Sequence, residues 1–218
     1  MLTLFEELFL LSLDEDSGNI LSFTKKNFAY GIAGAILSEL VFQDKVQLNE
    51  KHRLLLTNSD PTGNEILDEA IHEIKHSEKP HRPSYWISQF NQKKKKLREQ
   101  LGTSLAEKGI LHQEDKRFFW IYNEDEVNHA MAPLKYQLKT TLRGKILATD
   151  VNDARSLALL KILAASGMLG LVFTQDEQTL STRTINEKVI RASLENPVLQ
   201  PIEEIGQGVA VCLEDDFD

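Results

Sequence analysis

The segment 27–42 limits the fold of this chain more than any other part of the sequence. It is apolar almost throughout and long enough for about four helical turns, so a helix here has almost no face for water. Gly31 and Gly34 lie in its interior, where each glycine costs about 1 kcal/mol relative to alanine. Close approach of another backbone is the usual compensation for such glycines. The segment therefore predicts a central, tightly packed helix.

Helical spacing of hydrophobic residues recurs along most of the remaining chain. At the N-terminus, Thr3 and Glu6 have the spacing of a capping box, and the turn at 60–63 leads into a further amphipathic pattern. The stretch 84–108 fits either one helix or two. Together these patterns predict helices at 4–11, 66–74, 84–108, 134–148, 153–168 and 186–194.

A few shorter segments have the composition of β-strands. Residues 46–48 and 53–56 flank a polar turn and predict a small hairpin. The aromatic run at 117–122 is the strongest strand signal in the chain and predicts a second hairpin. The acidic residues 197–218 are predicted to form a tail in which 209–213 adds a strand. We therefore expect residues 1–218 to form a single, mainly α globular domain with small β-hairpins.

The net charge argues against a chain that binds nucleic acid or membranes over a broad surface. The 218 residues suffice for one substantial core, and 33 acidic against 25 basic residues give a formal net charge of −8. Broad binding to polyanions needs charge of the opposite sign. Any binding of an anion must therefore use a local basic patch.

Residue patterns that carry catalysis are absent from the sequence. The single cysteine, Cys212, excludes an intrachain disulfide and a cysteine-rich metal site. Phosphate-binding loops, dinucleotide-binding turns, and metalloprotease and hydrolase motifs do not occur. His72 and His76 have a spacing that can bind zinc, but the pattern offers no further ligand, and solvent-facing histidines are the simpler interpretation. We therefore expect no enzyme, no bound metal and no cofactor.

Membrane contact is predicted only from the side of a bilayer. The N-terminal segment carries Glu6 and Glu7 where a signal peptide has positive charge. No uninterrupted apolar run approaches the roughly 18–20 residues that span a bilayer. We expect a cytoplasmic protein that associates with membranes peripherally.

The basic run 93–98 is the strongest candidate binding site in the sequence. Four lysines, Leu97 and Arg98 follow one another, although like charges within two helical turns repel each other. Such repulsion is tolerated on a solvated helix face, or where the charges are used to bind an anion. On a helix, Lys95 and Arg98 are three residues apart and point the same way. The pair predicts a two-cation clamp suited to a phosphate monoester.

Several blocks of the sequence resemble the Golgi phosphoprotein 3 family. They keep the family's order and spacing and cover most of residues 2–111, whereas the part from about 174 is less similar. They include Leu-Thr-Leu-Phe-Glu-Glu at the start of the chain and Glu-Lys-Gly-Ile-Leu at 107–111. The resemblance rests on residues 2–11, 31–40, 60–70, 97–101 and 105–111, with weaker similarity at 155–173.

This resemblance implies a mainly helical domain that binds phosphatidylinositol 4-phosphate at cytosolic membranes and recruits the cytoplasmic tails of membrane proteins. Two basic residues of the family's headgroup pocket fall on Lys95 and Arg98. The aromatic residue of that pocket falls on Thr24 and a further arginine falls on Ala33, so the match to the pocket is incomplete. We therefore expect a generic anionic, phosphoinositide-like headgroup to bind at Lys95, Arg98, Lys25, Lys26 and Thr24.

The resemblance also implies a hydrophobic β-hairpin that contacts the membrane or mediates self-association. Packing of its aromatic rings on the helical core is the alternative. In this chain the hairpin would consist of a return strand and Phe118, Phe119, Trp120, Ile121 and Tyr122.

Two further functions fit the same residues. The acidic surface suits a protein-interaction module for basic cytoplasmic tails. A basic helix at 93–98 with an aromatic wing at 118–122 suits a winged-helix nucleic-acid binder, although the negative net charge and the lack of a second basic stripe argue against it. We expect an anionic phospholipid as the main partner, cytoplasmic tails and a second copy of the chain as further partners, and no nucleic acid.

Overall fold

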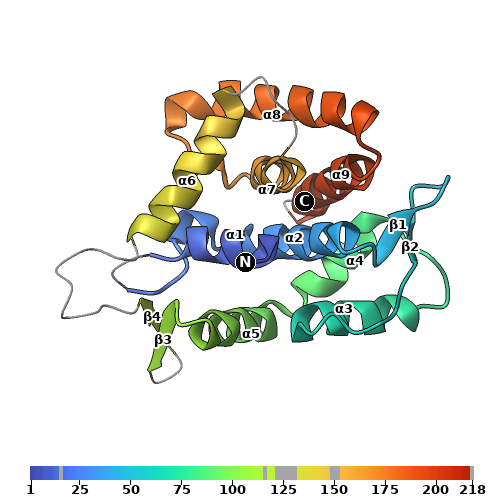
Figure 1. The fold of residues 1–218 in the computed structure, drawn as a ribbon, viewed down its shortest axis with the longest axis horizontal. Coiled ribbons are helices and arrows are strands. Elements are labelled where there is room, and N and C mark those ends of the chain that lie inside the picture. Colours follow the sequence, from blue (N-terminus) through green and yellow to red (C-terminus); the bar gives the residue numbers. More distant parts are fainter. Residues whose placement is uncertain (15–16, 115–116, 121–131, 148–152, 217–218) are drawn as a thin grey trace.

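The computed structural model describes residues 1–14, 17–114, 117–120, 132–147 and 153–216, and these are mainly α-helical, as the sequence predicts. Figure 1 shows the helices packed around the middle of the molecule. In chain order, the helices, two 3-10 turns (η) and strands are α1 (Leu4–Ser12), η1 (Ser22–Thr24), α2 (Phe28–Phe42), β1 (Val46–Leu48), β2 (Leu54–Leu56), α3 (Glu65–Lys75), α4 (Pro83–Asn91), α5 (Lys94–Glu107), β3 (Leu111–Glu114), β4 (Arg117–Trp120), α6 (Ala132–Leu147), α7 (Ala154–Ala165), η2 (Leu169–Leu171), α8 (Gln175–Glu195) and α9 (Leu199–Asp215).

Helix α2 is the centre of the fold, which confirms the prediction made from its apolar sequence. Every residue from Phe28 to Val41 is buried. The helix packs against α1, α4, α7 and α9. In Figure 1, α1 and α2 cross the middle of the molecule, with α3 and α5 on one side and α7, α8 and α9 on the other. An apolar helix is stable in such a position because none of its faces must contact water.

The two glycines of α2 are compensated by side chains rather than by a neighbouring backbone, which corrects part of the prediction. A Cβ added at Gly31 would collide with the Cε of Met168. At Gly34, it would lie 2.7 Å from Cγ2 of Val209 and 3.0 Å from Cδ1 of Ile162. The missing methyl groups therefore leave room for three side chains. Met168 follows α7, Ile162 belongs to α7 and Val209 belongs to α9.

Helix α1 begins with the predicted capping box. The Thr3 hydroxyl accepts a hydrogen bond from the Glu6 backbone N–H at 3.4 Å, and the Glu6 carboxylate accepts one from the Thr3 backbone N–H at 2.8 Å. These bonds pair donors at the start of the helix that have no partner within it. The box therefore fixes where α1 begins against α2.

Two small antiparallel hairpins complete the described fold. Strand β1 pairs with β2 in the register Val46 with Leu56, as the sequence predicts. Strand β4 pairs with β3, with Leu111 opposite Trp120 and Glu114 opposite Arg117, so the partner strand precedes the aromatic run in the chain. Of the predicted hairpin residues, Phe118, Phe119 and Trp120 lie in β4, whereas Ile121 and Tyr122 lie outside the described residues.

The prediction for the C-terminal segment is wrong. Residues 199–215 form helix α9 rather than a tail with a strand, and α8 is much longer than the predicted helix at 186–194. The valines around 209 favour a strand locally, and the glycines disfavour a helix. However, Ile202, Ile205 and Val209 recur at helical spacing and are fully buried. Contacts with α2, α4, α7 and α8 therefore override the local preference.

Cys212 is a structural residue of α9, in agreement with its interpretation as a small apolar side chain. It is buried, and its thiol donates a hydrogen bond to the Ser84 carbonyl of α4 at 3.2 Å. Burial raises the pKa of this thiol to about 11, so it is protonated at neutral pH.

Candidate functional site

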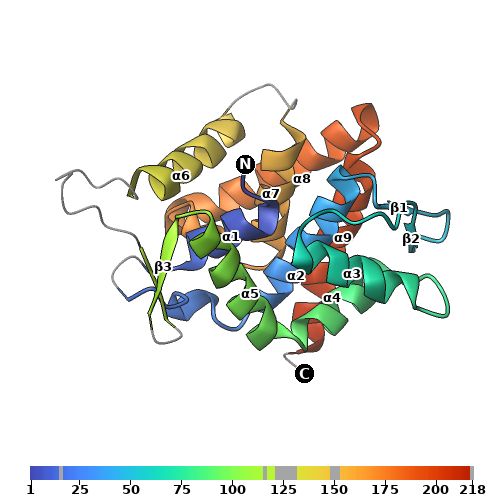
Figure 2. The same cartoon turned by 60° about the horizontal axis from the view of Figure 1, so that its bottom comes forward.

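The basic run lies at the start of α5, directly after α4. Pro83 is the first residue of α4, and α5 begins at Lys94 after a short turn, so the stretch 84–108 is two helices. Leu97, Leu101 and Leu105 are buried and fix one face of α5 against the core. The lysines at 94–96 are exposed on the outer face, and Figure 2 brings the helix to the front of the molecule.

Two of the five cations in the run are neutralised by the neighbouring helix α3. Lys93 forms an ion pair with Glu73, and Lys96 forms one with Glu69 at 2.5 Å. The hydrogen bond from Lys96 to Glu69 raises the pKa of Lys96, because it stabilises the charged form. These exposed pairs contribute little to stability, but they orient α5 against α3.

The other cations of the run keep their charge unpaired. Within the part of the chain that the structure describes, Lys94, Lys95 and Arg98 have no hydrogen bond and no ion pair through their side chains. Lys94 and Lys95 are exposed, and Arg98 is partly exposed. The start of α5 also has neither a side-chain cap nor an acidic residue in its first turn. Free cations at the positive end of a helix dipole favour an anion.

The other residues of the predicted headgroup site, Lys25, Lys26 and Thr24, lie in different environments. Lys25 and Lys26, in the turn between η1 and α2, are exposed. Thr24 is fully buried, and its hydroxyl donates to the Leu21 carbonyl at 2.8 Å, so it shapes this turn. Ala33 is fully buried within α2.

Phe23, which lies in η1 directly before Thr24, was not predicted from the sequence. Its side chain is 56% exposed, although the residue is large and hydrophobic. Its ring edge lies against Gly170 of η2, where an added Cβ would be 3.3 Å from Cε2 of Phe23. Exposure of a single aromatic residue has no signature in the sequence, because it depends on the turn that η1 makes.

The two histidines of α3 form no metal site with other described residues. The ring centroids of His72 and His76 are 4.1 Å apart, and Nδ1 of His76 lies 2.7 Å from the His72 carbonyl oxygen. No group of three or more His, Cys, Asp or Glu side chains in the described residues could hold a metal ion.

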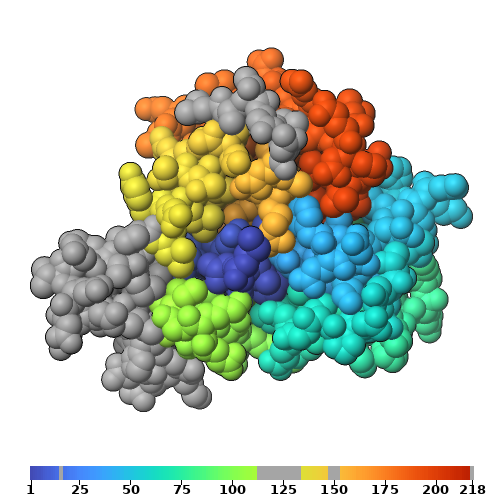
Figure 3. All heavy atoms as spheres, viewed as in Figure 1, coloured from blue at the N-terminus to red at the C-terminus, as the bar shows by residue number. Residues whose placement is uncertain are grey.

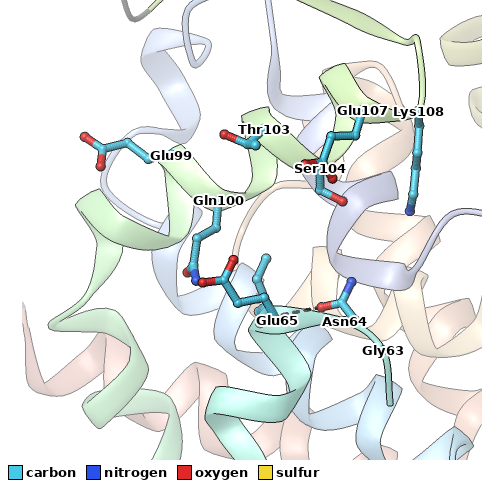
Figure 4. A pocket seen from close by; sticks show the side chains of 10 residues that line it. Gly63, Asn64, Glu65, Glu99, Gln100, Thr103, Ser104, Glu107 and Lys108 are labelled. Carbon is cyan, nitrogen blue, oxygen red and sulfur yellow. Dashed lines mark hydrogen bonds between the residues drawn. The ribbon is translucent and has the colours of Figure 1, made fainter. Parts of the chain in front are cut away.

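The other end of α5 lines an acidic pocket of about 480 Å³ together with the start of α3. Figure 4 shows Gln100 reaching from α5 toward Glu65 of α3. The Nε2 group of Gln100 donates to Glu69 at 3.1 Å, whereas its Oε1 atom is buried and has no hydrogen-bond partner. Glu99 and Glu107 line the pocket as exposed carboxylates.

Lys108 lines this pocket but does not neutralise Glu99 or Glu107, because it is paired with Glu6. Lys108 contacts both Glu6 oxygens, at 2.5 and 2.6 Å, and the Ser104 hydroxyl donates to the same carboxylate at 2.6 Å. Burial raises the pKa of Glu6, but the hydrogen bonds from Lys108, Ser104 and Thr3 outweigh it and leave the pKa below its ordinary value. Helix α5 therefore carries the basic run at its start, followed by exposed carboxylates at Glu99 and Glu107.

Comparison with known proteins identifies a family and a relative with similar sequences. The sequence model of the family described as Golgi phosphoprotein 3 matches residues 4–205 of the chain. The protein named vacuolar protein sorting-associated protein 74 from Eremothecium gossypii is 32% identical over 170 residues, which cover 69% of this chain and 49% of that protein. This chain thus spans about half the length of that relative. Among the described residues, no helix is both long enough and apolar enough to cross a bilayer.

Proposed function

This chain belongs to the Golgi phosphoprotein 3 family, and from that premise we propose that it is a peripheral membrane adaptor that binds the anionic headgroup of a phospholipid through Lys95 and Arg98. The role is one of binding, with no catalytic step. Lys25 and Lys26 add charge near the bilayer, and Thr24 shapes the turn that carries them.

The different pairing of the cations in the basic run supports this proposal most directly. Lys93 and Lys96 are held by carboxylates of α3, whereas Lys95 and Arg98 have no partner among the described residues. Since Lys95 and Arg98 are three residues apart on one helix, one phosphate group can contact both. A guanidinium binds phosphate oxygens in a two-pronged geometry, and an ammonium adds a compact charge.

The net charge of −8 makes the site local. A protein of this charge is repelled by an anionic leaflet at long range, so the proposed contact is limited to the basic surface at the start of α5. Each cation near such a leaflet contributes about 1 kcal/mol of attraction. A phosphomonoester headgroup, as in phosphatidylinositol 4-phosphate, carries more charge at one point than phosphatidylserine and fits the two-cation site better.

The aromatic hairpin is the proposed second contact of this adaptor. Strand β4 carries Phe118, Phe119 and Trp120, and the prediction extends to Ile121 and Tyr122. Aromatic rings are favoured at the interface between water and the acyl chains. The hairpin would thus contact the membrane or a second copy of the chain once α5 has bound a headgroup.

Vesicle cosedimentation tests the headgroup site. Phosphatidylcholine vesicles containing phosphatidylinositol 4-phosphate are compared with phosphatidylcholine vesicles in which phosphatidylserine supplies the same total charge. We expect the double variant Lys95→Ala with Arg98→Ala to bind about tenfold more weakly or worse, since two cations are lost.

The matched control is the double variant Lys93→Ala with Lys96→Ala. It removes the same charge from the same helix, but from residues that are already paired. We expect it to bind much more strongly than the first variant. Equal losses in the two variants would mean that only net charge matters, and no loss in the first would show that the site is wrong.

A second candidate function, binding of basic cytoplasmic tails, is favoured by the acidic pocket at the end of α5. Its exposed carboxylates, Glu99 and Glu107, can accept hydrogen bonds from lysine or arginine side chains. Fluorescence titration with a labelled lysine-rich peptide tests this function. Binding should weaken in Glu99→Gln with Glu107→Gln and at high salt, and binding that persists in both would rule out this pocket.

The winged-helix alternative remains an untested hypothesis. Its helix would have to present all five cations of the run to nucleic acid, yet Lys93 and Lys96 are held by acidic side chains. A gel-shift titration with mixed duplex DNA at moderate salt tests it directly. Micromolar or tighter binding would support it over the adaptor function.

A further inference from the structure

A second pocket, of about 320 Å³, lies where α1, α6 and the start of α7 meet. Figure 3 views the molecule from the face on which the blue N-terminal residues border α6 in yellow and α7 in light orange. The lining combines leucines with carboxylates, neutral polar side chains, the Met1 amino group and the Arg155 guanidinium. We call it the Glu7 pocket, and the residues that matter here are Glu7, Leu10, Leu134, Gln137, Leu138 and Thr141.

The carboxylates around the Glu7 pocket differ in whether they have a direct partner. Arg155 is committed to Glu39, with hydrogen bonds of 3.1 and 2.9 Å to its two carboxylate oxygens. Lys145 is paired with Asp153 at 3.1 Å. Within the described residues, the Glu7 carboxylate has no hydrogen bond and no ion pair. The amino group of Met1 also lines the pocket but forms no ion pair with Glu7, so Glu7 lacks a direct charged partner among the described residues.

The raised pKa of Glu7 agrees with its lack of a direct partner. Burial raises the pKa of Glu7 to about 7, Arg155 opposes the rise, and the carboxylates of Glu39, Asp153 and Glu6 add to it. A carboxylate that is costly to ionise alone gains most from a cation that enters the same pocket.

We propose that the Glu7 pocket binds an alkylammonium or alkylguanidinium group, with Glu7 as its counter-ion. The side-chain oxygens of Gln137 and Thr141 can accept the N–H groups that Glu7 does not. Leu10, Leu134 and Leu138 would contact the aliphatic chain of the ligand. The volume fits a ligand of the size of a lysine or arginine side chain, at the lower end of small-molecule sites. This site is separate from α5 and does not depend on the lipid-binding function.

Ligand binding at this site should depend on pH, with a definite sign. The charged groups around Glu7 are the amino group of Met1, Arg155, and the carboxylates of Glu6, Glu39 and Asp153. With a pKa of about 7, Glu7 is ionised in roughly one molecule in ten at pH 6 and nine in ten at pH 8. Affinity for the cation should therefore rise about tenfold over this range, and binding near pH 7 should release a proton.

Calorimetric titration of the full chain with butylammonium chloride tests the site, with butanol as the neutral isostere. We expect binding at pH 8 that is about tenfold weaker at pH 6 and about tenfold weaker in Glu7→Gln, as for loss of one charge-assisted hydrogen bond. Glu78→Gln is the matched control, because it removes an exposed carboxylate between α3 and α4. It should leave the affinity unchanged, and butanol should bind no better than at background.

A second variant tests the site by filling it. Gln137 is exposed at the rim of the pocket, so Gln137→Lys introduces a tethered ammonium without disturbing the core. We expect this variant to exclude butylammonium and to lower the pKa of Glu7, measured by carbon-detected nuclear magnetic resonance. Unchanged titration of Glu7 in this variant would contradict the site.

The same titration distinguishes the two sources of such a cation. A blocked tripeptide with lysine at its centre is titrated beside butylammonium. Tighter binding of the peptide, lost in Glu7→Gln, assigns the pocket to a basic polypeptide, and equal affinity assigns it to a free amine. If neither probe binds, or if Glu7→Gln binds both as well as the unmodified chain, the proposal is wrong.

Discussion

Replacement of Gly208 by alanine should loosen the docking of α9 on α4. A Cβ at this position would lie 2.9 Å from the backbone nitrogen of Ser84, 3.1 Å from Cδ1 of Ile87 and 3.3 Å from the carbonyl carbon of Pro83. Two of these three atoms belong to the backbone at the start of α4 and cannot rotate away. The helices must therefore move apart to admit the methyl group.

The magnitude follows from two opposing effects. Overpacking of a core contact costs about 1–3 kcal/mol, whereas alanine gains about 1 kcal/mol over glycine inside a helix. Because the obstruction is backbone, we expect the cost to exceed the gain and the free energy of unfolding to fall by about 1–2 kcal/mol. The control is Gly144→Ala in α6, where an added Cβ meets no atom within 4 Å. That variant should gain about 1 kcal/mol.

Urea unfolding followed by circular dichroism measures both variants at the same pH and salt. The two should move the unfolding midpoint in opposite directions, with an unchanged dependence on urea concentration. If Gly208→Ala stabilised the protein as much as Gly144→Ala, close packing of α9 against α4 would be refuted.

Two further predictions concern buried titratable groups. In Lys108→Ala, burial should dominate and raise the pKa of Glu6, which lies below its ordinary value in the unmodified chain. The folded chain loses stability when acid protonates Glu6, and in this variant the loss should begin at a higher pH. Urea unfolding measured across pH tests this, with Lys95→Ala as the control. Parallel curves of stability against pH in the two variants would contradict the prediction. Cys212 should react with iodoacetamide at pH 8 far more slowly in the folded than in the urea-unfolded chain, by mass spectrometry, because burial raises its pKa to about 11.

The positions of most helices followed from the sequence, since helical periodicity is a property of neighbouring residues. The capping box at Thr3, the central helix α2 and the first hairpin all lie where their patterns predict them. The break between α4 and α5 was left open, because no glycine or proline marks residues 92–93. Helix α9 was missed, because its valines favour a strand and its glycines disfavour a helix, whereas its contacts with α4 and α7 cannot be read from the sequence.

Residue type alone identified the basic run at the start of α5 as the candidate site. The pairing of Lys93 with Glu73 and of Lys96 with Glu69 could not be predicted, because it joins residues 20 and 27 positions apart on two helices. The Glu7 pocket was missed for the same reason, since its lining comes from the first and the second half of the chain.

The sequence by itself determined that the chain is mainly helical, that α2 is its buried centre, and that five cations gather within residues 93–98 of an acidic protein. Only the tertiary structure decided which of those cations lack a partner among the described residues, and that the Glu7 carboxylate lacks one there too. The physical reason is that hydrophobic periodicity acts within one helix. Neutralisation and burial of a charge depend instead on side chains that other helices bring to it.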